Sequence, residues 1–124
     1  MKTVLVIDDD YGMKRYAEKF ISGFAVEQIY LLPDDESVLR KYDALIVDGQ
    51  GISNGKYKNG LEFCKAYDKP EGQAVVFHSG NGAYGDDAAE LRKRGVAIVT
   101  KGSNPEKLAL AVRFQIDKAK GEIK

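Results

Sequence analysis

The sequence has little cysteine, no excess of either charge and no long hydrophobic run, and each of these features narrows the class of protein. Cys64 is the single cysteine, which excludes an internal disulfide and favours a reducing compartment. Lys plus Arg equals Asp plus Glu, at 19 residues each, so the formal net charge is zero. This balance gives no support to binding of nucleic acid or of a membrane surface.

Hydrophobic runs are short throughout the 124 residues. The opening apolar run, Val4–Ile7, is too short for a signal peptide and far too short to span a bilayer. The length fits one domain with a core of its own, and the chain shows no repeat, low-complexity tract or interdomain linker. We therefore expect a single soluble, cytoplasmic domain that spans residues 1–124.

Five short apolar runs rich in Val and Ile recur along the chain, and each is bounded by polar residues or glycine. Their length and composition are typical of buried β-strands. The expected strands are Thr3–Ile7, Val26–Leu32, Ala44–Val47, Ala74–Phe77 and Val96–Thr100.

Segments with helical spacing or helix-start signals separate these runs. Asp10 stands where its side chain could cap the first of them, and Asn104-Pro105 is typical of the start of the last. Strands that alternate with helices predict a doubly wound parallel sheet covered on both faces, with all strand carboxyl ends at one edge. The expected helices cover Met13–Ile21, Ser37–Tyr42, Leu61–Tyr67, Ala88–Arg94 and Pro105 to near Gly121.

Polar residues follow four of the five expected strands at this edge. Three carboxylates, a hydroxyl and an ammonium group would meet there, contributed by Asp8, Asp9, Asp48, Ser79 and Lys101. Two like charges about 4 Å apart cost about 4 kcal/mol at an effective dielectric of 20, so close carboxylates share a proton or hold a cation. Oxygen ligands favour Mg²⁺, and a metal beside a hydroxyl and an ammonium group suits a phosphoryl group.

Over essentially its whole length, the chain resembles the receiver domains of two-component response regulators. The resemblance rests on four motifs in order, each at a strand end, and on "NGLEFC", which is similar to the start of a receiver helix. The four motifs are "VIDD", "LIVDG", "VVFHSG" and "VTKGSNPEKL".

The resemblance implies a flavodoxin-like (βα)5 fold with strand order 2-1-3-4-5. It makes Asp48 the phosphoacceptor, and it assigns contacts with the phosphoryl group to Ser79 and Lys101. The implied Mg²⁺ ligands are Asp8, Asp9, Asp48 and the backbone carbonyl of Gln50.

A receiver domain would also have partners of a defined kind. The resemblance implies a histidine kinase or phosphotransfer protein as donor and a downstream protein as target, with no direct contact with nucleic acid or membrane. Transfer to Asp48 would be self-catalysed, so we expect no turnover enzyme.

Two positions depart from the receiver pattern. Gly102 follows Lys101 where receivers usually carry proline, and Ile98 stands where they usually carry an aromatic residue. Without proline a cis peptide costs about 2.5–4 kcal/mol, so we expect the Lys101–Gly102 bond to be trans. These departures leave the residues expected to carry phosphoryl transfer in place. They alter positions through which receivers usually pass the signal to a partner.

Two other functions fit parts of the pattern. The chain could be a degenerate receiver that binds partners without phosphorylation, which the residues at 98 and 102 favour. It could also be a haloacid-dehalogenase-like phosphatase that uses Asp8 and Asp10, although this leaves Asp48 without a role. We interpret His78 and Cys64 as structural residues rather than site residues.

Overall fold

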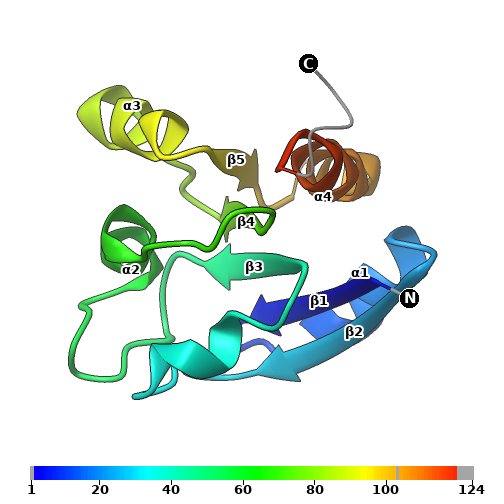
Figure 1. Ribbon diagram of the computed structural model, residues 1–124, viewed down its shortest axis with the longest axis horizontal. Helices are drawn as coiled ribbons and strands as arrows, with labels where there is room; N and C mark the ends of the chain where they lie inside the picture. Colours follow the sequence, from blue (N-terminus) through cyan, green and yellow to red (C-terminus); the bar gives the residue numbers. More distant parts are fainter. Residues whose placement is uncertain (1, 103, 120–124) are drawn as a thin grey trace.

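The computed structural model describes residues 2–102 and 104–119, which form one five-stranded parallel sheet (Figure 1). The strand order is β2-β1-β3-β4-β5, as the sequence predicts, and every neighbouring pair is parallel. The strands are β1 (Lys2–Ile7), β2 (Phe24–Ile29), β3 (Ala44–Asp48), β4 (Ala74–Ser79) and β5 (Val96–Thr100).

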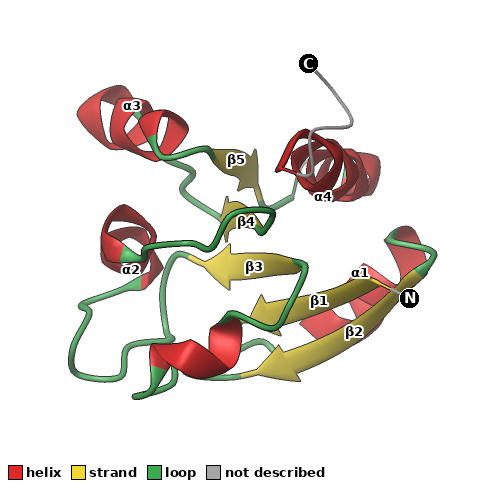
Figure 2. Cartoon of the chain, viewed as in Figure 1, coloured by secondary structure: helices red, strands yellow, loops and turns green. Residues whose placement is uncertain are grey.

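Four α-helices and one 3-10 helix connect these strands within the described residues (Figure 2). No helix in this part of the chain has the length and apolarity needed to cross a bilayer. The elements are α1 (Met13–Phe20), η1 (Glu36–Leu39), α2 (Gly60–Ala66), α3 (Gly85–Lys93) and α4 (Pro105–Ala119).

The helices cover both faces of the sheet, with α1 and α4 on one face and η1, α2 and α3 on the other (Figure 1). Alternate side chains of β1 supply the two cores: Val4 and Val6 face α1 and α4, whereas Leu5 and Ile7 face the other side. A strand buried on both faces reads as a continuous apolar run, which is why β1 could be recognised from sequence.

The expected helix at Ser37–Tyr42 is wrong, because the structure has only the four-residue 3-10 helix η1 there. The Asp35 carboxylate caps its start by accepting a hydrogen bond from the Ser37 backbone N–H. η1 ends at Leu39, and by Asp43 the backbone already bonds to Thr3 of β1.

Two further predictions differ from the structure, namely the end of the second strand and the capping of the first helix by Asp10, and other element ends shift by up to three residues. The second strand ends at Ile29 rather than Leu32, because its partner β1 ends level with it at Ile7. The Asp10 carboxylate accepts from the Gly12 N–H in the turn before α1, and the cap residue Gly12 makes no side-chain cap bond. The predicted end of the last helix near Gly121 lies outside the described residues.

Strand register brings the carboxyl ends to one edge. Ile7 pairs with Val47, Asp48 pairs with His78, and Ser79 pairs with Thr100. The residues that follow β1 and β5 therefore leave the sheet beside the last residues of β3 and β4.

Candidate functional site

Lys101 joins two of the acidic strand ends. Its Nζ lies 2.9 Å from Asp8 Oδ2 and 3.0 Å from Asp48 Oδ1, so the ammonium group bridges the ends of β1 and β3. The Lys101 backbone N–H donates to the Ser79 carbonyl at 2.9 Å, which holds the start of the loop after β5 against the end of β4. The predicted meeting of these side chains at one edge is confirmed.

The two carboxylates that Lys101 bridges are buried. Asp8 is 1% and Asp48 6% exposed. Burial raises the pKa of Asp48 to about 6, with a further rise from the nearby Asp8 charge, although the bond from Lys101 acts in the opposite direction. Burial by itself would lower the pKa of Lys101, but its bonds to Asp8 and Asp48 raise it overall, so the lysine stays charged.

Asp9 completes a cluster with the geometry of a cation site. One carboxylate oxygen each from Asp8, Asp9 and Asp48 lies within 4.8 Å of the others. Three carboxylates and one ammonium group leave a formal charge of −2, which a divalent cation would neutralise. Asp8 Oδ2 is buried, and among the described residues it has the Lys101 ion pair but no further hydrogen-bond partner. This oxygen-only set fits Mg²⁺.

The cluster opens onto a shallow pocket of about 340 Å³. Asp9 and Gln50 are exposed at its rim, whereas Ser79 is 4% exposed at the end of β4. All of the expected site residues except buried Asp8 line this pocket; the assignment of the Gln50 carbonyl as a metal ligand stays a prediction. The lining residues are Asp9, Asp48, Gln50, Gly51, Ser79, Gly80, Asn81 and Lys101.

Glycines allow the backbone to approach the acidic groups closely. A Cβ atom at Gly51 would collide with the Asp9 carboxylate, and a Cβ atom at Gly60 would collide with the Asp48 carbonyl. Gly51 also has a φ of +81°, which side chains rarely adopt. The loop after β3 therefore needs glycine at both points to reach its position around Asp9 and Asp48.

Gln28 supports the acidic loop and was missed by the sequence analysis. Its Nε2 donates to the carbonyls of Asp8 and Asp10 at 2.8 and 2.7 Å, and its Oε1 accepts from the Lys14 N–H at 2.7 Å. A single polar residue inside an expected strand is a weak signal. The predicted strand, which ran on to Leu32, placed Gln28 in its middle.

Several residues lie outside this pocket. Cys64 is buried in the core, and burial raises the pKa of its thiol, so the interpretation as a core residue is confirmed. Asp10 does not line the pocket of Asp48, and its carboxylate is bonded to Gly12. This position disfavours a phosphatase in which Asp8 and Asp10 act together.

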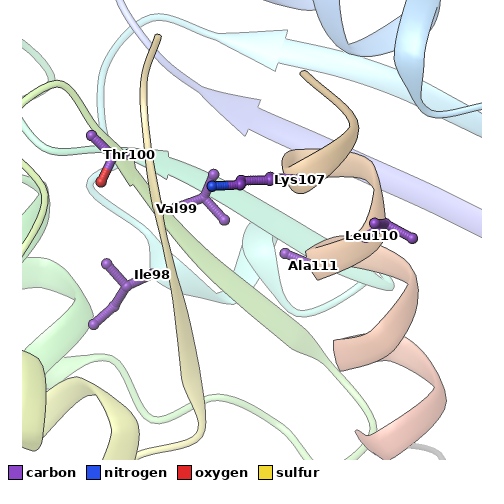
Figure 3. Close-up of a pocket in the computed structure, with 6 residues that line it drawn as sticks. All are labelled: Ile98, Val99, Thr100, Lys107, Leu110 and Ala111. Carbon is purple, nitrogen blue, oxygen red and sulfur yellow. The ribbon is translucent and has the colours of Figure 1, made fainter. Parts of the chain in front are cut away.

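The structure places Ile98 and Gly102, the two residues that depart from the receiver pattern. The Lys101–Gly102 bond is trans, as predicted, and Gly102 has a φ of +83°. Ile98 borders a groove between β5 and α4 that shares no residue with the acidic pocket, and its side chain points away from α4 (Figure 3), toward the core on the α2 and α3 face. The groove is lined by Ile98, Val99, Thr100, Lys107, Leu110 and Ala111.

Several solved structures with the same fold are response-regulator receivers. A CheY-like receiver domain protein from Methanospirillum hungatei JF-1 is 17% identical with a TM-score of 0.76, and the match covers 99% of both chains. A receiver domain protein from Clostridium thermocellum is 20% identical with a TM-score of 0.70, over 99% of this chain and 100% of that one.

A third similar structure is the BeF3-activated receiver domain of DrrB, a Thermotoga maritima protein. It is 20% identical with a TM-score of 0.69, over 94% of this chain and 98% of that one. No protein-family model matches the chain, and no curated protein matches its sequence. The likeness at this level of identity shows that the chain has the receiver-domain fold.

Proposed function

We propose that this chain, which has the receiver-domain fold, is a phosphorylation switch whose acceptor is Asp48. A histidine kinase or phosphotransfer protein would supply the phosphoryl group in the cytoplasm, and the modified domain, residues 1–124, would change its binding to a downstream protein. The observation that carries this proposal is the Lys101 bridge between Asp8 and Asp48 beside Asp9 in one open pocket.

The pocket supports an in-line transfer to Asp48. An Asp48 carboxylate oxygen attacks phosphorus and forms a new O–P bond, while the donor's bond to phosphorus breaks and its electron pair leaves with the donor. With a pKa of about 6, Asp48 is mostly ionised at neutral pH and has the lone pair that attack requires.

The neighbouring groups stabilise the charge that the phosphoryl group brings. Lys101 already lies 3.0 Å from Asp48 and would neutralise one transferred oxygen, and the buried Ser79 hydroxyl would donate to another. Mg²⁺ held by Asp8, Asp9 and Asp48 would supply a Lewis acid that screens the carboxylates from the incoming phosphate. The BeF3-activated state of the DrrB receiver supports a phosphoryl-binding pocket in this fold.

The test is incubation with acetyl phosphate and Mg²⁺, followed by intact mass measurement and mapping of the modified residue. We expect one phosphoryl group on Asp48, and no modification of Asp48→Asn, because an amide is not a nucleophile here. Asp9→Ala should lose most reactivity together with its Mg²⁺ dependence, whereas Lys101→Ala should still bind the metal. Asp10→Asn is the matched control, because Asp10 lies outside the pocket and should label like wild type.

Three results would redirect the assignment. If wild type with Mg²⁺ stays unlabelled, the alternative of a phosphorylation-independent binding module takes first place. If Asp48→Asn labels as well as wild type, the acceptor is another residue. Continued turnover of a generic phosphate ester by Asp48→Asn would instead support the dehalogenase-like phosphatase.

A further inference from the structure

The outward face of α4 exposes two large apolar side chains. Leu110 is 64% and Phe114 48% exposed, and among the described residues of the four α-helices no other large apolar side chain is exposed in this way. Leu110 also borders the groove between β5 and α4, so the apolar surface continues beside the helix (Figure 3). Exposed apolar side chains gathered on one surface are typical of protein–protein contact sites.

A charged residue stands on each side of this apolar pair, on the same helical face. Lys107, Leu110, Phe114 and Asp117 follow one another at intervals of three, four and three residues, which places their side chains in one line along the helix. Lys107 is exposed and Asp117 half-buried, and neither has an ion-pair partner within residues 2–102 and 104–119. We call these four residues the α4 stripe.

The order of residues in the α4 stripe makes it complementary to itself. Leu110 lies two residues before Val112, and Phe114 lies two residues after it. Lys107 and Asp117 lie five residues before and after the same position. An apolar residue on one side of Val112 therefore has an apolar counterpart on the other side, and the positive charge has a negative counterpart.

This order selects one arrangement of two α4 helices. If they pack antiparallel about a two-fold axis at the level of Val112, Leu110 lies opposite Phe114 of the second copy. The same axis brings Lys107 opposite Asp117, and the symmetry repeats each contact. A parallel arrangement would instead bring like charges together. The formal net charge of zero adds no overall repulsion between two copies.

We propose that the α4 stripe binds the α4 stripe of a second copy of the chain, in an antiparallel, two-fold symmetric dimer. Contact between Leu110 and Phe114 removes apolar surface from water, and each Lys107 ammonium group pairs with an Asp117 carboxylate of the other copy. One helix from each copy makes a small interface, so the dimer is weak and dissociates in the micromolar range. The stripe shares no residue with the acidic pocket, so association needs neither Mg²⁺ nor a phosphodonor.

Sedimentation equilibrium of the unmodified chain, in Mg²⁺-free buffer from micromolar to millimolar concentration, tests for this dimer. We expect a reversible monomer–dimer equilibrium in wild type, weakened about tenfold or more in Leu110→Gln. Because Leu110 is exposed, this variant should keep its fold, which circular dichroism and thermal unfolding check. A wild type that stays monomeric up to millimolar concentration would leave this face to another protein and overturn the proposal. An equally strong dimer of Leu110→Gln would overturn it as well.

Exchange of the two charges shows which residues meet across the axis. Lys107→Glu and Asp117→Lys each create two symmetry-related pairs of like charge, so each variant alone should dimerise about fivefold or more weakly. In an equimolar mixture, the mixed dimer regains both attractive pairs, and association should return close to the wild-type strength. Lys93→Glu, at an exposed position of α3, is the matched control, because it changes the net charge as Lys107→Glu does and should dimerise like wild type. Single variants that behave like Lys93→Glu, or a mixture no stronger than they are, would overturn the proposal.

Discussion

Alanine substitutions at Gly51 and Gly55 can be compared to separate the effect of backbone strain from the effect of disturbing the acidic site. Both have positive φ angles, of +81° and +89°. A Cβ atom at Gly51 would strike the Asp9 carboxylate, whereas nothing lies within 4 Å of a Cβ atom at Gly55. Any difference between the two alanine variants therefore reports on Asp9.

We expect Gly51→Ala and Gly55→Ala each to lower the free energy of unfolding by about 1–2 kcal/mol, the cost of a left-handed conformation with a side chain. Only Gly51→Ala should also weaken Mg²⁺ binding, because the new methyl group displaces Asp9. Urea unfolding and calorimetric Mg²⁺ titration of both variants check this. Equal Mg²⁺ affinities would show that Asp9 is not needed to hold the ion.

At the scale of elements, the site depends on how β1, β2 and α1 meet. Gln28 at the end of β2 bonds to the carbonyls of Asp8 and Asp10 after β1 and to the Lys14 N–H in the first turn of α1. The Gln28 side chain thus holds the segment between β1 and α1 with three hydrogen bonds. Two of these bonds need an N–H donor, which makes the amide group essential to the arrangement.

Replacement of Gln28 by Glu tests this arrangement, because it keeps the shape and removes the donors. Two backbone carbonyls would then face a carboxylate, so we expect Gln28→Glu to destabilise the protein by about 1–3 kcal/mol and to weaken Mg²⁺ binding. Gln28→Ala should have a smaller effect on both. The neighbouring exposed Glu27→Gln provides the control and should leave Mg²⁺ affinity unchanged. Wild-type Mg²⁺ affinity in Gln28→Glu would contradict a positioning role.

For the whole molecule, the buried acidic cluster couples folding to pH, and the Mg²⁺ that we propose it holds would couple folding to the metal as well. Because the folded pKa of Asp48 is raised to about 6, the folded state binds a proton between about pH 4 and pH 6 that the unfolded chain has already released. The contribution of Asp48 to stability is therefore present at low pH and is lost as the pH rises through this window. A bound divalent cation favours the ionised form and compensates for this loss.

We expect the metal-free protein, compared with Asp48→Asn, to lose stability as the pH rises from about 4 to above 6. Saturating Mg²⁺ should remove this difference and stabilise wild type by about 2.7 kcal/mol at a concentration of 100 times its dissociation constant. Below pH 6, the apparent Mg²⁺ affinity should fall by up to about tenfold per pH unit. Thermal unfolding with and without Mg²⁺ across this range measures all three effects. Identical pH profiles of wild type and Asp48→Asn would contradict the raised pKa.

Much of the fold and of the site follows from local sequence patterns. The continuous apolar run of β1 and the polar residues after it predicted both a strand and its functional end, because side chains of a central strand are buried on both faces. Asp48, Ser79 and Lys101 could be placed in the same way, since parallel strands share one carboxyl edge.

Other features depended on contacts between distant residues. Residues 36–39 form only a 3-10 helix before the chain rejoins the sheet at Asp43, and β2 ends at Ile29 because β1 ends beside it. The role of Gln28 depends on the same pairing, since its side chain meets the acidic loop only in this register.

The sequence by itself determined which residues lie at the carboxyl edge, because strand alternation and the order of the elements are local properties. Only the tertiary structure decided how these residues pair. It placed Lys101 between Asp8 and Asp48, left Asp9 at the rim, and kept Asp10 out of this pocket. The reason is physical: neighbouring residues along a chain leave the end of a strand in different directions, and packing on each face of the sheet selects their partners.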